Sequence, residues 1–142
     1  MHLEWIHLGI LKKMVHGYNV KIPVLLEPMS DDVQLGFVQH FLKFQSASLF
    51  VKGRIWILWE LALNISFNTL ANQLIYVKIR VSSGLQFSFS AIYGRCTRIA
   101  RRPLWNALES LAGLRQGPWM IAEDFNVISK ASEILGVSSL NV

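Results

Sequence analysis

Short apolar segments separated by turn residues fill the middle of this chain, and they constrain the fold more than any other feature. Gly53 and the Ser-Ser-Gly stretch at 82–84 are typical of hairpin turns between such segments. Residues 87–91 alternate phenylalanine with serine, which predicts a strand with one wet or polar-lined face. The predicted strands are residues 48–51, 54–59, 64–67, 74–80 and 86–93.

A membrane-spanning helix is the alternative for part of this region, because residues 55–77 have nearly the required length. Several polar side chains argue against it, since they would be costly in lipid. They are Glu60, Asn64, Asn68, Asn72 and Gln73. We therefore favour paired strands and expect no membrane partner.

The composition predicts an intracellular globular protein. The chain has 142 residues, enough for one domain, and only 16% of them are charged. A single cysteine, Cys96, excludes an internal disulfide framework and cysteine-rich zinc sites. No secretory signal is recognisable at the N-terminus, because Glu4 and two histidines interrupt its apolar stretch. We expect a location in the nucleus or cytoplasm. A net charge of +5 permits a polyanionic partner.

The N-terminal part predicts a helix, a buried strand and a second helix, as in α/β proteins. The first helix covers residues 3–16, and the strand covers residues 22–26, with Glu27 at its end. The second helix covers about residues 32–44, with Ser30 or Asp31 as its cap. The expected apolar face of the first helix contains Leu3, Ile6, His7, Ile10, Leu11 and Met14, and that of the second contains Val33, Phe37, Phe41 and Phe44.

The C-terminal part carries the residues most suggestive of chemistry. An arginine-rich loop at 94–102 precedes a predicted helix at 103–114, whose core face contains Leu104, Leu108 and Leu111. Trp119-Met120-Ile121 then predicts a short buried strand, and Asp124 and Asn126 follow it. A carboxylate and an amide at a strand end suit metal-assisted hydrolysis of a phosphate ester. The same two residues are also ordinary turn-formers.

Four stretches in this order resemble the endonuclease/exonuclease/phosphatase superfamily, which has the DNase I-like fold. They are Val24-Leu25-Leu26-Glu27-Pro28-Met29, Ile92-Tyr93-Gly94, Arg101-Arg102-Pro103-Leu104-Trp105, and Pro118-Trp119 through Asp124-Phe125-Asn126-Val127-Ile128. The strongest resemblance is to the endonuclease domain of plant non-LTR (LINE-type) retrotransposons. It covers roughly residues 8–136.

The resemblance implies an α/β (α+β) fold, a sandwich of two mixed β-sheets with flanking helices and an active site at the strand ends. We expect residues 1–142 to form a single, truncated domain of this type. The family's asparagine near the start and its closing aspartate and histidine have no counterpart here. The expected domain therefore lacks N- and C-terminal strands of the family fold.

The resemblance also implies a catalytic role for particular residues. Glu27 matches a glutamate that holds Mg²⁺ or Mn²⁺, and Tyr93 matches a tyrosine that reaches the scissile phosphate. Asp124 matches the aspartate that positions or deprotonates the attacking water, and Asn126 matches the amide that holds the phosphate. Glu27 could instead be a solvated strand end, and Tyr93 an aromatic residue at an interface.

Two functions remain open at this point. The first is a remnant of a Mg²⁺-dependent phosphodiesterase or endonuclease of retrotransposon origin, weakly active or inactive, whose expected partner is nucleic acid, with DNA favoured over RNA. Glu123 stands where the family has a small residue, and none of the four histidines matches the catalytic one. The alternative is a non-catalytic module that binds nucleic acid or protein. Its binding loop would contain Arg95, Arg98, Arg101 and Arg102, which could equally be solvated.

Overall fold

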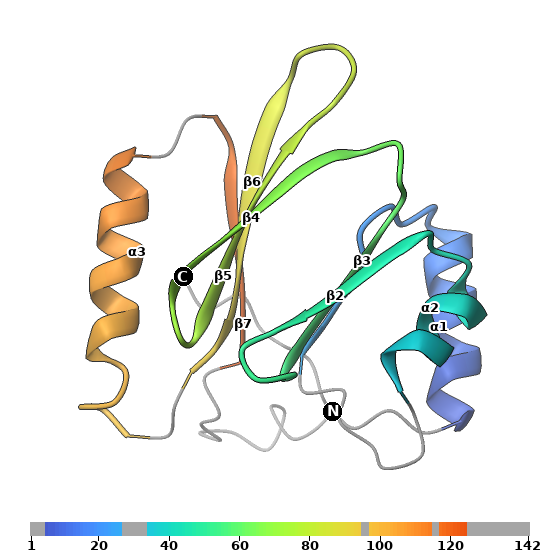
Figure 1. Cartoon of the computed structure of the whole chain (residues 1–142), viewed down its shortest axis with the longest axis horizontal. Coiled ribbons are helices and arrows are strands. Elements are labelled where there is room, and N and C mark those ends of the chain that lie inside the picture. Colours follow the sequence, from blue (N-terminus) through green and yellow to red (C-terminus); the bar gives the residue numbers. More distant parts are fainter. Residues whose placement is uncertain (1–4, 27–33, 95–96, 115–116, 125–142) are drawn as a thin grey trace. The chain divides into compact units, whose positions relative to one another are not determined.

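The computed structural model describes residues 5–26, 34–94, 97–114 and 117–124, and the chain divides into two compact units, Met1–Leu63 and Asn64–Val142. Each unit contains one β-sheet and at least one helix (Figure 1). In chain order the elements are α1 (Trp5–Gly17), β1 (Val24–Leu26), α2 (Leu35–Leu42), β2 (Ser46–Phe50), β3 (Ile55–Trp59), β4 (Asn64–Ala71), β5 (Leu74–Arg80), β6 (Gln86–Tyr93), α3 (Arg102–Leu114) and β7 (Trp119–Asp124).

The first unit contains a three-stranded antiparallel sheet in the order β1-β3-β2. The central strand β3 consists of apolar residues, and Ile55 to Leu58 are buried. Its core combines residues of α1 and α2 with residues of the strands, so that the helices cover one face of the sheet. The buried members are Leu8, Val15, Leu25, Val38, Leu42, Phe44, Trp56 and Leu58.

The second unit contains a four-stranded mixed sheet in the order β4-β5-β6-β7. Strands β4, β5 and β6 pair antiparallel, whereas β7 runs parallel to β6. Helix α3 connects these two parallel strands and packs Leu104 and Leu111 against one face of the sheet. Leu74, Tyr76 and Ile92 form the strand side of this core. We call the side of this sheet that packs on α3 its α3 face.

The predicted α+β class, with two sheets and flanking helices, is confirmed. The predicted strands at 74–80 and 86–93 have the observed bounds of β5 and β6, whereas β4 extends four residues beyond its predicted end, to Ala71. The hairpin turns are also where the sequence predicts them. Gly53 and Gly84 adopt positive φ angles of 80° and 88° between antiparallel strand pairs, a conformation that glycine adopts without strain. The assignment to a single domain stays a prediction.

The apolar faces predicted for the first two helices are wrong in part. In α1 the buried residues are Leu8 and Val15, while Ile10 and Met14 are more than half exposed. Apolar residues occur all around this helix, so their spacing does not select one face. Leu3 and the side chain of Ile6, which are also part of the predicted face, lie outside the described residues.

Helix α2 is shorter than predicted and buries different residues. It begins at Leu35 and ends at Leu42, because Lys43 adopts the left-handed conformation with φ 63°. Val38 and Leu42 are its buried residues, whereas Phe37 is exposed on the helix surface. Phe44 is buried as predicted, but it lies beyond the helix end. The predicted caps, Ser30 and Asp31, and the apolar residue Val33 lie outside the described residues.

The alternation in β6 places two buried serines on one face of the strand. Ser88 and Ser90 are buried, and each makes a hydrogen bond to the neighbouring β7 region. The indole Nε1 of Trp119 donates to Ser90 Oγ at 2.9 Å, and Ser88 Oγ donates to the carbonyl oxygen of Pro118 at 3.5 Å. The serines therefore form hydrogen bonds with the start of β7 and with the residue that precedes it.

Within the described ranges, none of the helices combines the length and the apolar character needed to cross a membrane.

Gly117 supplies the first testable prediction. It lies between α3 and β7 with φ 77°, and a Cβ atom there would be 2.7 Å from the carbonyl oxygen of Gln86. We expect Gly117→Ala to lower the free energy of unfolding by about 1–3 kcal/mol, because it adds backbone strain and a clash. Chemical denaturation of the purified protein measures this change.

Gly113→Ala is the matched control. Gly113 lies within α3, and a Cβ atom there would meet no atom within 4 Å. Alanine favours a helix over glycine, so this variant is expected to gain up to about 1 kcal/mol. Equal unfolding free energies for the two variants would show that the conformation at Gly117 is not required.

Candidate functional site

The carboxyl ends of β6 and β7 meet at one edge of the second sheet. Parallel strands joined by a helical crossover bring these ends to the same edge. Tyr93, the last residue of β6, is the register partner of Asp124, the last residue of β7. Two residues 31 positions apart in the sequence are therefore neighbours in the sheet. They are the predicted catalytic residues that the structure brings together.

Glu123 lies on the α3 face of the sheet. It is the register partner of Ile92, and it alternates along β7 with Trp119 and Ile121, which pack against the core under α3. Only 6% of Glu123 is exposed. By the same alternation Tyr93 lies on the other face, with Phe89 and Ala91. Glu123 therefore does not add a negative charge on the side of the sheet where Tyr93 lies.

The turn between β4 and β5 supports Tyr93. The backbone N–H of Tyr93 donates to the carbonyl oxygen of Gln73 at 3.0 Å, and Tyr93 is half-buried. Gln73 itself is 1% exposed, and its side-chain Nε2 donates to the carbonyl oxygen of Ala100 at 2.7 Å. Gln73 thus connects the end of β6 with the arginine-rich loop.

The described part of the arginine-rich loop is a compact turn that leads into α3. The backbone N–H of Ala100 donates to Thr97 Oγ1 at 3.2 Å, and the N–H of Arg101 donates to the carbonyl oxygen of Thr97 at the same distance. Arg98 and Arg102 are exposed, whereas Arg101 is half-buried, and its Nε is buried without a hydrogen-bond partner. Arg98 and Arg102 therefore face solvent on a loop that Gln73 connects to the end of β6, where Tyr93 lies.

Several predicted site residues lie outside the described residues. These are Glu27, Arg95 and Asn126. Among the residues that the structure does describe, no group of three or more histidine, cysteine, aspartate or glutamate residues is placed to hold a metal ion. The roles of these residues and the binding of Mg²⁺ stay predictions.

Gln73 is a site residue that no pattern in the sequence singles out. A glutamine next to an asparagine between two strands is an ordinary turn residue. Its role depends on a contact with a residue 27 positions away, which no local pattern reveals.

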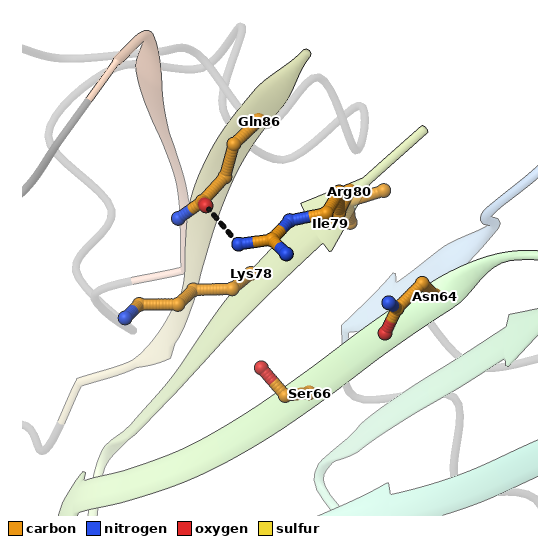
Figure 2. Close-up of a pocket in the computed structure, with 6 residues that line it drawn as sticks. All are labelled: Asn64, Ser66, Lys78, Ile79, Arg80 and Gln86. Atoms are coloured by element: carbon orange, nitrogen blue, oxygen red, sulfur yellow. Dashed lines mark hydrogen bonds between the residues drawn. The ribbon is translucent and has the colours of Figure 1, made fainter. Parts of the chain in front are cut away.

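A polar pocket occupies the other end of the second sheet. It has a volume of about 280 Å³ and opens on the α3 face, beyond the residues that α3 covers. Figure 2 shows its lining side chains projecting from three neighbouring strands. They are Asn64, Ser66, Lys78, Ile79, Arg80 and Gln86. The length of β6, ~24 Å at the usual rise per residue, separates this pocket from the edge with Tyr93.

The pocket was also not predicted from the sequence, although the residues of β5 contain a signal for it. Lys78 and Arg80 alternate with Val77 and Ile79, which shows that one face of the strand becomes polar towards its end. The matching polar residues of β4 and β6 are identified only by the strand register, which pairs Asn64 with Arg80 and Arg80 with Gln86.

Two solved structures are similar to this chain in fold. The endonuclease domain of TRAS1, a telomere-specific non-LTR retrotransposon, superposes with a TM-score of 0.62 at 12% sequence identity and covers 91% of this chain. TDP2 from C. elegans superposes with a TM-score of 0.55 at 14% identity and covers 87%. Both have the DNase I-like fold, which this chain therefore shares.

The chain spans 58% of the length of the TRAS1 domain and 43% of the length of the TDP2 chain. No protein-family model matches this chain, and no curated protein sequence matches it.

The contact between Gln73 and Ala100 leads to the second prediction. Gln73→Leu removes the donor to the Ala100 carbonyl oxygen, and we expect the free energy of unfolding to fall by about 1–3 kcal/mol. The loop at 97–102 should also open more often, so limited trypsin digestion should cleave faster after Arg98 and Arg101. Mass spectrometry of the fragments identifies the cleavage sites.

Asn72→Ala is the control for this substitution, because Asn72 lies in the same turn and is exposed. Its effect on the free energy of unfolding is expected to stay within about 0.5 kcal/mol, with an unchanged digestion rate. If trypsin cleaved the Gln73→Leu variant at the wild-type rate, the glutamine would not be what holds the loop.

Proposed function

We propose that this chain carries part of the centre of a metal-dependent phosphodiesterase of the non-LTR retrotransposon endonuclease type, with DNA as its substrate. The observation that carries the proposal is the register pairing of Tyr93 with Asp124 at the carboxyl ends of two parallel strands. Two residues that the family resemblance selects from distant parts of the sequence are adjacent in a DNase I-like fold. The plant LINE-type origin is part of the proposal.

Each residue has a defined role in the proposed centre. Asp124 positions or deprotonates the attacking water, and Tyr93 donates a hydrogen bond to the scissile phosphate. Asn126 holds the phosphate, and Glu27 is the residue that would bind Mg²⁺ or Mn²⁺. Such a metal stabilises negative charge on phosphate oxygens when it is bound.

The proposal includes a low level of activity, at or near zero. None of His2, His7, His16 and His40 matches the catalytic histidine of the family, which normally completes the general acid/base machinery. Glu123 also stands where the family has a small residue, and it is buried on the α3 face, away from the face where Tyr93 lies.

Nicking of supercoiled plasmid tests the proposal. We expect slow nicking that requires Mg²⁺ and that falls below the detection limit in Asp124→Ala, because that substitution removes a proton-transfer group, which typically contributes ~100-fold or more. Tyr93→Phe should retain the fold and lower the rate as well, since it deletes only the phenolic hydroxyl. Gel electrophoresis of the nicked form measures the rate.

Glu109→Gln serves as the control, because Glu109 is an exposed acid on α3, away from the strand ends. Its nicking rate should equal that of the wild type. Nicking that continues unchanged in Asp124→Ala or in EDTA would refute the assignment of the centre, and fast turnover would refute the weak-activity part of the proposal.

A non-catalytic binding module is the second candidate, and the exposure of Arg98 and Arg102 on an anchored loop favours it. Under this hypothesis the loop binds phosphates, so affinity falls steeply with salt. Replacing Arg98, Arg101 and Arg102 with glutamine should weaken DNA binding and lower the salt dependence. Unchanged binding in that triple variant would exclude the arginine-rich loop as the binding element.

A further inference from the structure

We infer that the polar pocket at the β4–β5–β6 end of the second sheet is a separate contact site for the phosphate backbone of nucleic acid. Its cations are Lys78 and Arg80, which are both exposed and lie two residues apart on the same face of β5. Residues 64–94, which form the three strands and their turns, contain no aspartate or glutamate. The positive charge of the pocket is therefore not neutralised by any acid in these strands.

The neutral lining residues are also suited to phosphate. Asn64, Ser66 and Gln86 each carry a hydrogen-bond donor, and such side chains commonly contact phosphate oxygens together with arginine and lysine. Lys78 and Arg80 lie ~6.8 Å apart along the strand. Duplex DNA presents about four negative charges over that length of its axis. Both cations of the pocket can therefore contact phosphates of one duplex.

Arg80 is held in place before a ligand arrives. Its Nη2 donates to Gln86 Oε1 at 3.3 Å across the β5–β6 pair (Figure 2). One donor of the guanidinium is engaged in this bond, and the others remain available to an anion. Less side-chain entropy is lost on binding when the cation is already ordered.

The chemistry of the pocket favours nucleic acid over a protein partner. Protein interfaces depend on buried aromatic or aliphatic anchors. The one apolar lining residue here is Ile79, which is 1% exposed and so cannot anchor a partner. The identity of the polyanion as DNA rests on the proposed function, whereas the site itself rests on its own charge and geometry.

DNA binding by the full 142-residue chain tests this inference. Fluorescence anisotropy of a labelled duplex in EDTA, at several salt concentrations, gives the Kd without cleavage. We expect the double variant Lys78→Gln/Arg80→Gln to raise the Kd at least ~10-fold at low salt and to lower the salt slope by about 1–2, because one or two phosphate contacts are lost. Asn64→Asp, which adds a negative charge in the pocket, should also weaken binding.

The control double variant Lys13→Gln/Lys52→Asn removes the same charge from exposed positions in the first unit. It should leave the salt slope unchanged. Equal effects of the two double variants, or no DNA binding by the wild type at low salt, would overturn the inference. Competition by poly-glutamate as strong as by unlabelled DNA would overturn the assignment to nucleic acid. Unfolding midpoints confirm that each variant is folded.

The same set of proteins separates this inference from the proposed function. Asp124→Ala should lose nicking and keep its Kd, because Asp124 lies at the other end of the sheet. A wild-type protein that binds DNA through Lys78 and Arg80 without nicking it would support the contact site and would show that the catalytic centre of this chain is inactive. Nicking by a protein whose DNA binding does not depend on Lys78 and Arg80 would support the catalytic proposal and refute the contact site.

Discussion

The parallel pairing of β6 with β7 is the constraint on which the candidate site depends. A hairpin cannot join parallel strands, so the chain has to cross over, and here it does so through α3. The crossover places Leu104 and Leu111 over the sheet, and the burial of these side chains stabilises the pairing. It also brings Tyr93 beside Asp124. Core packing and the geometry of the site are thus consequences of one topological feature.

Buried hydrogen bonds make this arrangement more specific, because apolar contacts alone would not select one strand register. The hydrogen bond from Trp119 to Ser90 links β7 to β6, and the bond from Gln73 to Ala100 fastens the loop before α3. Each such bond contributes about 1 kcal/mol, but losing one partner leaves a buried group unsatisfied. Their larger effect is on register, since each bond is satisfied in one alignment only. The positions of Tyr93 and of the exposed arginines follow from them.

Much of the fold was accessible from local pattern. The bounds of β5 and β6, the turns at Gly53 and Gly84, and the core face of α3 match their predictions because each depends on residues close together in the chain. The buried faces of α1 and α2 did not match their predictions. Apolar residues occur on several sides of these helices, and packing against the sheet decides which of them are buried. Gln73 and the polar pocket were missed for a related reason, since their partners come from different strands.

Residue types and their order along the chain suffice to indicate an α+β chain with the DNase I-like fold and to select Tyr93 and Asp124 as residues of interest. Tertiary structure decides which residues become neighbours. Strand register pairs Tyr93 with Asp124, places Glu123 on the buried α3 face, and gathers Lys78 and Arg80 with polar residues of two other strands. Register depends on contacts between residues far apart in the sequence. A shift of one strand by a single residue would move every side chain of that strand to the opposite face.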